Sequence, residues 1–307
     1  MNLQQLRIFR EAVRRNFNLT EVSSALHTSQ SGVSKHMRDL EDELGVELFV
    51  RHGKRLLGLT GPGTEMVEVV ERILRDTHAL RAIASEYQSR DDGALHVATT
   101  HTQARYALPK VVAAFRERYP RVHLNLYEAA PEQIAVMLAD GRADIGIATE
   151  GLEESATLAT FRYYDWHHAV LVPVGHPLEG AERLDIQALG QYPIVTYREG
   201  FTGRKRIDQA FRDAGIEAEY ALSAMDADVI RTYVELGLGV GILASMAVGH
   251  LSDSTLRVLP SDHLFGKNTT WIAVARDHYL RGYALDFIQL CDVGLTPERV
   301  RAGIAGA

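Results

Sequence analysis

From residue 94 onward the hydrophobic residues switch between a spacing of two and a helical spacing, and this alternation limits the fold more than any other feature of the chain. In LHVAT, residues 95–99, apolar and polar side chains alternate, whereas the next apolar residues recur three or four positions apart. The predicted order is strand 94–99, helix 102–118, strand 121–127, helix 131–140 and strand 143–148. Strands that alternate with helices at this pitch form a parallel α/β sheet.

A second α/β unit is expected from about residue 166 to residue 262. Residues 269–292 then supply a last strand and helix that can return to the first unit. Two such lobes, joined by crossing segments, enclose a cleft. Because ligands of open α/β sheets bind beyond the carboxyl ends of the strands, binding residues are expected at those ends.

Hydroxyl and amide side chains gather at these strand ends. Thr100, Thr102 and Gln103 lie between the first strand and its helix. Thr149 follows a later strand, and Thr202 precedes a helix in GFTGRKRIDQAF. Unpaired N–H groups and the helix dipole favour an anion at a helix N-terminus, by about 0.3 to 2 kcal/mol depending on burial. The alternative is that Thr100 and Thr202 only cap their helices, at about 1 kcal/mol each.

Other candidate chemistry is weaker. Trp166 either walls the cleft or belongs to the core, and Arg204 is expected to be solvated because it lies in the first turn of a helix. His167 and His168 are adjacent and so point apart, and the remaining histidines lack the spacing of metal ligands. GLGVG, residues 237–241, predicts a helix stop before a strand rather than a phosphate loop.

The N-terminal segment predicts three short helices. Apolar residues of 3–15 fall on one helical face, and a second helix starts at about Asn18, whose side chain can cap it. A third helix begins after Thr28 or Ser29 and ends at Gly45. Two amphipathic helices joined by a tight polar turn form a helix-turn-helix unit, whose second helix enters the major groove of DNA. The alternative is a three-helix domain with a merely solvated surface.

The outward face of the third helix carries side chains that contact base edges and phosphates. These are Gln30, Ser31, Ser34, Lys35 and Arg38. The far end of the helix is acidic, with Asp39, Glu41, Asp42 and Glu43, so its N-terminus is expected to face the DNA. VELFVRHGKRLLGLT then predicts a two-stranded wing, from which Arg51 and Lys54 contact backbone phosphates.

A long helix follows, from about residue 62 to residue 89. Its apolar stripe has the a/d spacing of a heptad repeat and consists of Met66, Val70, Ile73, Thr77, Leu80, Ala84 and Tyr87. We expect the stripe to pair with the same helix of a second subunit, which would place two DNA-binding domains about a two-fold axis. SRDDG, residues 89–93, is a hinge-like boundary.

The composition is that of a protein without a membrane-spanning segment or a disulfide framework. The 307 residues contain no apolar run long enough to span a membrane, and the start of the chain lacks the apolar core of a signal peptide. A single cysteine, Cys291, agrees with a reducing compartment, so the protein is expected to be cytoplasmic. The net charge is −7, but residues 1–58 carry nine Lys or Arg against seven Asp or Glu. The basic excess is therefore local and N-terminal.

TSQSGVSKHMRDLEDELGVELFVR, followed by the wing, the long helix and a large α/β region, resembles the LysR-type transcriptional regulators over essentially the whole chain. ATTHTQARYALP, ERYPRV, ADIGIATE, GFTGR, DADVI and TYVELGLGVGILASMAV are similar to the CysB group of that family, activators of sulfur assimilation and cysteine synthesis. Ser31 departs from the Pro of many relatives, and Arg198 and Glu199 are charged beside the expected pocket.

The resemblance implies an α/β protein with three parts. These are a winged helix-turn-helix DNA-binding domain (1–60), a dimerisation linker helix (61–91) and a two-lobed effector domain like a periplasmic binding protein (92–307). Lobe I would comprise about 92–164 and 266–292, and lobe II about 165–265. In CysB-like proteins the positions of Thr100, Thr102, Gln103, Thr149 and Thr202 bind sulfate or an acetylserine inducer.

The expected partners follow from the same resemblance. They are double-stranded DNA, a small effector (sulfate, N-acetylserine or O-acetylserine) and further copies of the chain, as a homodimer that can pair into a homotetramer. No cofactor, metal or membrane is expected. One alternative is the same regulator tuned to another small anion or amino-acid derivative. Another is an enzyme with its chemistry in the cleft, for which the sequence offers no paired nucleophile and base.

Overall fold

A computed structural model of the protein describes residues 1–53, 55–88, 91–153, 155–249, 255–276 and 278–306, with the side chains of 78, 82 and 85–88 left out. The chain divides into two compact units, Met1–Ser85 and Glu86–Ala307. Lys54, a predicted phosphate contact, lies outside the described residues. Within the described residues, no helix combines the length and apolarity that crossing a membrane would require.

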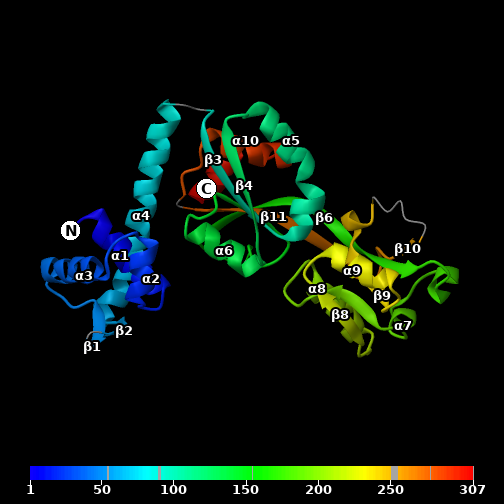
Figure 1. Ribbon diagram of the computed structural model, residues 1–307. Helices are drawn as coiled ribbons and strands as arrows, with labels where there is room; N and C mark the ends of the chain where they lie inside the picture. Colours follow the sequence, from blue (N-terminus) through cyan, green and yellow to red (C-terminus); the bar gives the residue numbers. More distant parts are fainter. Residues whose placement is uncertain (54, 89–90, 154, 250–254, 277, 307) are drawn as a thin grey trace. The chain divides into compact units, whose positions relative to one another are not determined.

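The first unit is a winged helix-turn-helix (Figure 1). Its elements are α1 (Leu3–Arg14), α2 (Leu19–Ala25), α3 (Gln30–Leu44), β1 (Phe49–His52), β2 (Arg55–Leu59) and α4 (Gly61–Gln88). The predicted caps are confirmed. The Asn18 side chain accepts the N–H groups of Thr20 and Glu21 at the start of α2, and Ser29 caps α3. Gly45 ends α3 in the left-handed conformation, with φ 71°.

Glu41 connects α3 to the wing. Its carboxylate accepts the backbone N–H groups of Leu48 (2.9 Å) and Phe49 (3.2 Å) and pairs with Arg51 at 2.5 Å. The residue is only 8% exposed. The expectation that Glu41 belongs to an outward acidic end of the helix is therefore wrong, because its side chain turns inward to satisfy the start of β1.

The apolar stripe of α4 is used in two ways. Val70 is buried in the core of the first unit, and Met66 and Ile73 pack against that core. Farther along, Leu80 is 68% exposed and Ala84 is also exposed. Among the described side chains of the predicted heptad stripe, Leu80 and Ala84 are therefore free to contact another chain, while the side chain of Tyr87 lies outside the described residues.

Lobe I of the second unit is a sheet with helices on both faces. The elements are β3 (Gly93–Thr99), the π-helical turn η1 (Gln103–Ala107), α5 (Pro109–Arg118), β4 (Val122–Glu128), α6 (Pro131–Ala139), β5 (Ile145–Ala148), α10 (Gly282–Cys291) and α11 (Pro297–Ala305). α5 and α10 cover one face and α6 covers the other (Figure 1). One difference from prediction is that the helix expected over 102–118 is divided into η1 and α5 by the turn before Pro109.

Lobe II repeats this plan. Its elements are the 3₁₀ turn η2 (Pro177–Gly180), α7 (Ile186–Leu189), β7 (Ile194–Tyr197), α8 (Arg204–Asp213), β8 (Tyr220–Ala224), α9 (Ala227–Glu235), β9 (Val240–Ala244), the 3₁₀ turn η3 (Ser245–Ala247) and β10 (Leu256–Leu259). β7 pairs in parallel with β8 and β9. Gly237, with φ 80°, follows α9 and precedes β9, so the predicted helix stop in GLGVG is confirmed.

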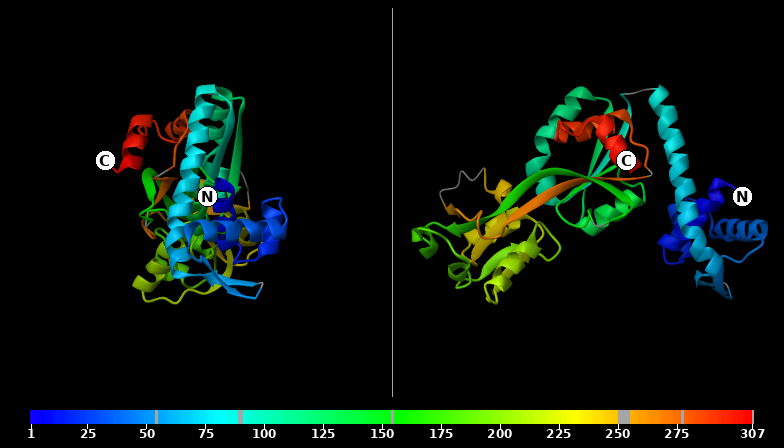
Figure 2. Two further views of the ribbon diagram at one scale, coloured as in Figure 1. Left: turned by 90° about the vertical axis from the view of Figure 1, so that its left-hand side faces the viewer. Right: turned by 180° about the vertical axis from the view of Figure 1, so that it is seen from behind.

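Two long strands cross between the lobes. β6 (Leu158–Pro173) pairs antiparallel with β11 (Lys267–Ala275) over its first part and with β9 and β10 over its last part (Figure 2). The strand order is β4-β3-β5-β11-β6-β9-β7-β8, with β10 on β6. Within each lobe the strands β3, β4 and β5, and β7, β8 and β9, pair in parallel, as predicted. The crossing strands β6 and β11 pair antiparallel with each other and with their neighbours β9 and β5, because they run in the opposite direction.

The buried Glu41 gives a stability prediction. Replacing Glu41 by Ala leaves two buried N–H groups unpaired and should lower the free energy of unfolding of the first unit by about 2 to 4 kcal/mol. Urea unfolding followed by circular dichroism measures this. Asp42→Ala, an exposed change on the same helix, should cost less than about 0.5 kcal/mol. Equal losses for the two variants would contradict a structural role for Glu41.

Candidate functional site

The predicted DNA-contacting side chains lie on the first turns of α3. Gln30, Ser31, Lys35 and Arg38 are exposed, and Ser34 is partly buried. The Ser31 hydroxyl lies 3.1 Å from that of Ser29, and the Arg38 Nε donates to the Ser34 carbonyl. Arg51 is paired with Glu41 rather than free, so its contact with phosphate remains a prediction.

The predicted effector residues all lie where the two lobes meet the crossing strands, and all are buried. Thr100, Thr102 and Gln103 come from the end of β3 and the start of η1, Thr149 follows β5, and Thr202 precedes α8. Their exposed fractions are between 0% and 9%. π-helical turns such as η1 occur frequently at functional sites.

A polar stripe on the crossing strands connects these loops. Side chains of β6 at alternate positions, Tyr164, Trp166 and His168, share one face with Asn268 and Thr270 of β11, because Trp166 lies opposite Asn268 and Tyr164 lies opposite Thr270. The Thr270 hydroxyl accepts the Trp166 indole N–H at 3.2 Å. Trp166 is 4% exposed and packs in the lobe II core, so it is a core residue that also anchors this stripe.

Gln103 ties lobe I to the stripe. Its Nε2 donates to the Thr270 hydroxyl at 3.3 Å, and its Oε1 accepts the Tyr164 hydroxyl. Both ends of the buried amide are therefore satisfied by the crossing strands. Burial raises the pKa of Tyr164 to about 12, so its phenol stays protonated and can donate to Gln103.

His168 ties lobe II to the stripe. One ring nitrogen lies 3.1 Å from the Thr202 carbonyl, and the other lies 3.3 Å from the Asn268 amide. Burial lowers the pKa of His168 to about 4, although the bond to Thr202 opposes the shift. The imidazole is therefore neutral at physiological pH and holds the loop before α8 as a hydrogen-bonding group.

The loop before α8 has an unusual backbone. Thr202 and Gly203 both have positive φ, 45° and 73°. A Cβ on Gly203 would lie 2.6 Å from Asn268 Oδ1 and 2.7 Å from His168 Cε1, so only glycine fits against the stripe. Gly203 is the N-cap residue of α8, and no side chain of its own caps the helix. Thr202 therefore does not cap α8, contrary to the alternative interpretation.

Glu150 reaches this loop from the other lobe. The residue follows Thr149, and its Oε1 accepts the Gly203 N–H. Burial raises the pKa of Glu150 to about 7, and the N–H bond from Gly203 only partly offsets that effect. A carboxyl group thus occupies the N-terminus of α8 in this structure.

A second contact between the lobes lies at η1. The Tyr106 hydroxyl donates to Asp228 of α9 at 2.9 Å, and the Arg105 Nε lies 3.5 Å from the same carboxylate. Burial, followed by the bond to Asp228, raises the pKa of Tyr106 to about 12. The neutral phenol therefore remains a donor across the lobe boundary.

Three charged residues differ in how far they enter the site. Arg204 is 5% exposed, pairs with Asp208 at 2.8 Å and lies 3.8 Å from the centroid of the Tyr220 ring. The expectation that Arg204 is solvated is therefore wrong, because its guanidinium turns back into lobe II. Arg198 and Glu199 are exposed, which places them outside the buried polar stripe.

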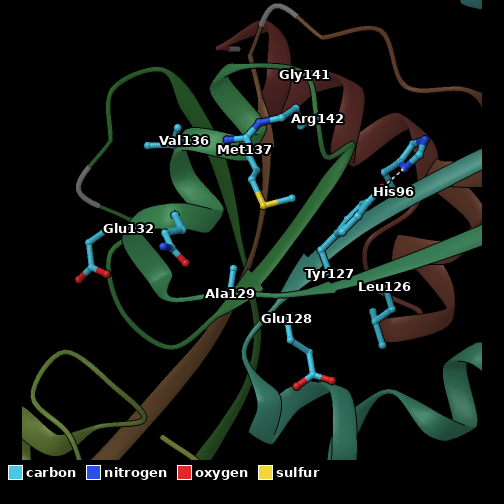
Figure 3. A pocket seen from close by; sticks show the side chains of 11 residues that line it. His96, Leu126, Tyr127, Glu128, Ala129, Glu132, Val136, Met137, Gly141 and Arg142 are labelled. Carbon is cyan, nitrogen blue, oxygen red and sulfur yellow. Dashed lines mark hydrogen bonds between the residues drawn. The ribbon is translucent and has the colours of Figure 1, made fainter. Parts of the chain in front are cut away.

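The described part of the second unit has two surface hollows, and of the five predicted effector residues Thr149 lines the first. One, of about 1160 Å³, extends from Thr149 and Glu150 to Gly203 and the outer side of α8. The other, of about 900 Å³, lies on lobe I between β4 and α6, and its lining includes Tyr127, Val136, Met137 and Arg142 (Figure 3). No predicted effector residue lines the second hollow.

Several site residues were not expected from the sequence, namely Glu150, Tyr164, His168, Asn268 and Thr270. The alternation Tyr164, Trp166, His168 in YYDWHH was an available signal, because it places three hydrogen-bonding groups on one strand face. Glu150 had no comparable signal. Among the described residues, no group of three or more His, Cys, Asp or Glu could hold a metal ion.

Comparisons with known proteins agree with this organisation. Residues 3–64 match the bacterial regulatory helix-turn-helix protein, lysR family, and residues 88–294 match the LysR substrate binding domain. The chain is 51% identical over 306 residues to the HTH-type transcriptional regulator SsuR of Burkholderia cenocepacia and 46% identical over 306 residues to CysB of the same organism. Each alignment covers 100% of this chain and 98% of the relative.

The second unit also resembles a solved structure of similar sequence. The crystal structure of the cofactor-binding domain of the Cbl transcriptional regulator superposes with a TM-score of 0.68 at 44% identity. The match covers 70% of this chain and 95% of that one. The two-lobed arrangement is therefore shared with a regulator domain of similar sequence.

The buried His168 predicts acid lability. Its pKa is about 4 in the fold against 6.5 when exposed, so the unfolded chain takes up a proton first as pH falls. The neutral His168 therefore contributes its full stabilisation above about pH 6.5. Between pH 6.5 and pH 4 the free energy of unfolding should fall by about 3 kcal/mol because of this residue. Fluorescence of Trp166 and Trp271, both in the second unit, follows its unfolding. His168→Gln should flatten this dependence, whereas the exposed His123→Gln should not; identical pH profiles for His168→Gln and the native chain would contradict the assignment.

Proposed function

The chain belongs to the LysR family of transcriptional regulators, and from this premise we propose that it controls genes of sulfur assimilation and cysteine synthesis. The proposed signal is sulfate or an acetylserine, bound between the lobes of the second unit. The similarity to CysB, together with motifs such as ATTHTQARYALP and GFTGR, supports this choice. The first unit binds DNA through its helix-turn-helix.

The observation that carries the effector proposal is the convergence of two polar loops on one stripe. Gln103 from lobe I and Thr202 from lobe II are held by neighbouring positions of the crossing strands. Hydroxyl groups at Thr100, Thr102, Thr149 and Thr202, with the N–H groups before α8, would surround an oxyanion or carboxylate. Such donors bind an anion without a full positive charge.

An effector must bind two conformations unequally to change the activity of the protein. The contacts between Tyr106 and Asp228 and between Glu150 and Gly203 join the two lobes in this structure. We infer that an effector held by both lobes changes the angle between them. That change would be transmitted to the paired DNA-binding units of an oligomer.

An alternative effector is another small anion or an amino-acid derivative. Arg198 and Glu199 favour this alternative because they add opposite charges near the hollow that extends from Thr149 to the outer side of α8. Glu199 is one of the residues that line this hollow. Their exposure means that they would contact only the outer end of a longer ligand. A ligand of sulfate size would leave both side chains in solvent.

The exposed half of the α4 stripe supports a homodimer, which could pair further into a homotetramer. Replacing Leu80 by Glu places a charge on this stripe without touching the core of the first unit, and should weaken dimerisation at least tenfold. Sedimentation equilibrium of the full chain measures this. The matched control is Arg81→Glu, an exposed change beside the stripe. An unchanged dimer for Leu80→Glu would contradict pairing through α4.

The effector site predicts a selective ligand response. Sulfate, N-acetylserine or O-acetylserine at about 100 times its dissociation constant should stabilise the full chain by about 2.7 kcal/mol in a thermal-shift titration. Thr202→Val should lose the response at least tenfold while DNA binding is retained. Thr232→Val, on the exposed face of α9, is the control. A native response in Thr202→Val would remove Thr202 from the site, and a lack of response to all three ligands would favour the alternative effector.

The recognition helix predicts base readout by Gln30. A preferred DNA sequence is first selected from a random pool with the native protein. Replacing Gln30 by Ala should weaken binding to that sequence by about 1 to 3 kcal/mol and change binding to unselected DNA little. Lys35→Ala should instead weaken both and reduce the salt dependence by about one unit. Fluorescence anisotropy over a salt series measures both effects. Equal losses on both DNAs for Gln30→Ala would contradict base readout.

A further inference from the structure

Glu150 occupies the place where the proposed anion would bind. The N-terminus of α8 is formed by the loop through Thr202 and Gly203, and it receives no cap from its own N-cap residue. The Gly203 N–H donates instead to Glu150 Oε1, from the opposite lobe. The carboxyl group of Glu150 is therefore an internal acceptor for the donors that an anionic effector needs.

The other carboxyl oxygen of Glu150 lacks a hydrogen bond among the described residues. Its Oε2 is inaccessible to water and has no hydrogen-bond partner within the part of the chain that the structure describes. A buried, unpaired charge is costly, so the neutral acid is favoured there. Burial, followed by the charges of Glu153 and Glu132, raises the pKa of Glu150 to about 7 against the opposing effect of the Gly203 and Thr202 backbone N–H groups. Both protonation states are consequently accessible near neutral pH.

The charged groups around Glu150 do not neutralise it. Lobe I contributes further carboxylates on this side of the cleft, Glu132 and Glu153. Lobe II contributes Glu199 and the first residues of α8, of which Arg204 is already paired with Asp208. Lys205 and Arg206 line the outer part of the same hollow, and neither of these two described side chains forms an ion pair with Glu150 that could fix its charge. His168, on the other side of Gly203, is neutral at physiological pH.

We propose that Glu150 makes the effector site selective for charge, so that a dianion such as sulfate enters only with uptake of one proton by the Glu150 carboxylate. The inference rests on the proposed anion site before α8. A sulfate dianion and the Glu150 carboxylate would repel each other strongly if both lay at the N-terminus of α8, beside the Gly203 N–H. The neutral Glu150 acid, in contrast, can remain beside the anion or turn away from it. The overall step is protein carboxylate, one proton and sulfate combining to give the protein acid with sulfate bound.

The proton linkage fixes the expected pH dependence. If only the protonated form accepts sulfate, the binding-competent fraction falls about tenfold between pH 6 and pH 8 for a group that titrates near pH 7. Sulfate remains a dianion over this range, so the ligand does not contribute to the change. At pH 8 the binding of each sulfate should take up close to one proton.

Isothermal titration calorimetry of the full chain with sodium sulfate tests the proposal. Titrations at pH 6, 7 and 8, at constant ionic strength in chloride, measure the affinity, and two buffers of different ionisation enthalpy measure the proton uptake. Native protein should lose affinity about tenfold from pH 6 to pH 8 with uptake approaching one proton. Glu150→Gln should bind sulfate with an affinity that is independent of pH and, at pH 8, about tenfold tighter than the native protein.

Two controls separate the possible failures. The first control is Glu153→Gln, which removes a neighbouring carboxylate and should keep the fall in affinity with rising pH. The second control is the proton uptake on sulfate binding, which is measured on the native protein without any substitution. Sulfate binding that is independent of pH in the native chain but lost in Thr202→Val would overturn the role of Glu150 and leave the proposed function standing. The same fall with pH in Glu150→Gln as in the native chain would also overturn it. An absence of sulfate binding in every protein at every pH would remove both the sulfate assignment and the inference.

Discussion

The antiparallel pairing of β6 with β11 is the interaction on which the rest of the effector domain depends. The same two strands complete the sheet of lobe I, carry the chain into lobe II and present the polar stripe between them. Their register places Trp166 opposite Asn268 and Tyr164 opposite Thr270. A change in the angle between the lobes must therefore bend or twist this pair, which couples the shape of the cleft to the arrangement of its hydrogen-bonding groups.

The buried polar groups of the cleft fall into two sets. Gln103 has both ends of its amide paired with the crossing strands, at Thr270 and Tyr164. His168, on β6, pairs with the Thr202 carbonyl and with Asn268, so these two side chains fix the two loops in place. In contrast, Glu150 Oε2 and Thr102 Oγ1 lack a hydrogen-bond partner among the described residues. Because an unpaired buried polar group costs about 1 to 3 kcal/mol, a ligand that pairs with Thr102, or with Glu150 in its protonated form, can gain most. This division separates the groups that hold the site from those available to a ligand.

Much of the fold could be predicted because its signals are local. Asn18, Ser29 and Gly45 mark helix ends through bonds and backbone angles within a few residues, and all three act as the sequence indicates. The strand ends at Thr100 and Thr149 are likewise visible in the hydrophobic spacing. The division of the first helix of lobe I into η1 and α5 could not be predicted, because a π-helical turn has no periodic signature over five residues.

The sequence by itself determined the order of the elements, their caps and the family to which the chain belongs, since these depend on neighbouring residues and on motifs. Only the tertiary structure decided which charged and polar residues are buried. Glu41 and Arg204 turn inward against expectation, while Glu150 and His168 meet at the loop before α8 from different elements. The partners of Glu150 and His168 are distant in the chain, up to the 100 residues between His168 and Asn268, and spacing alone carries no information about such contacts.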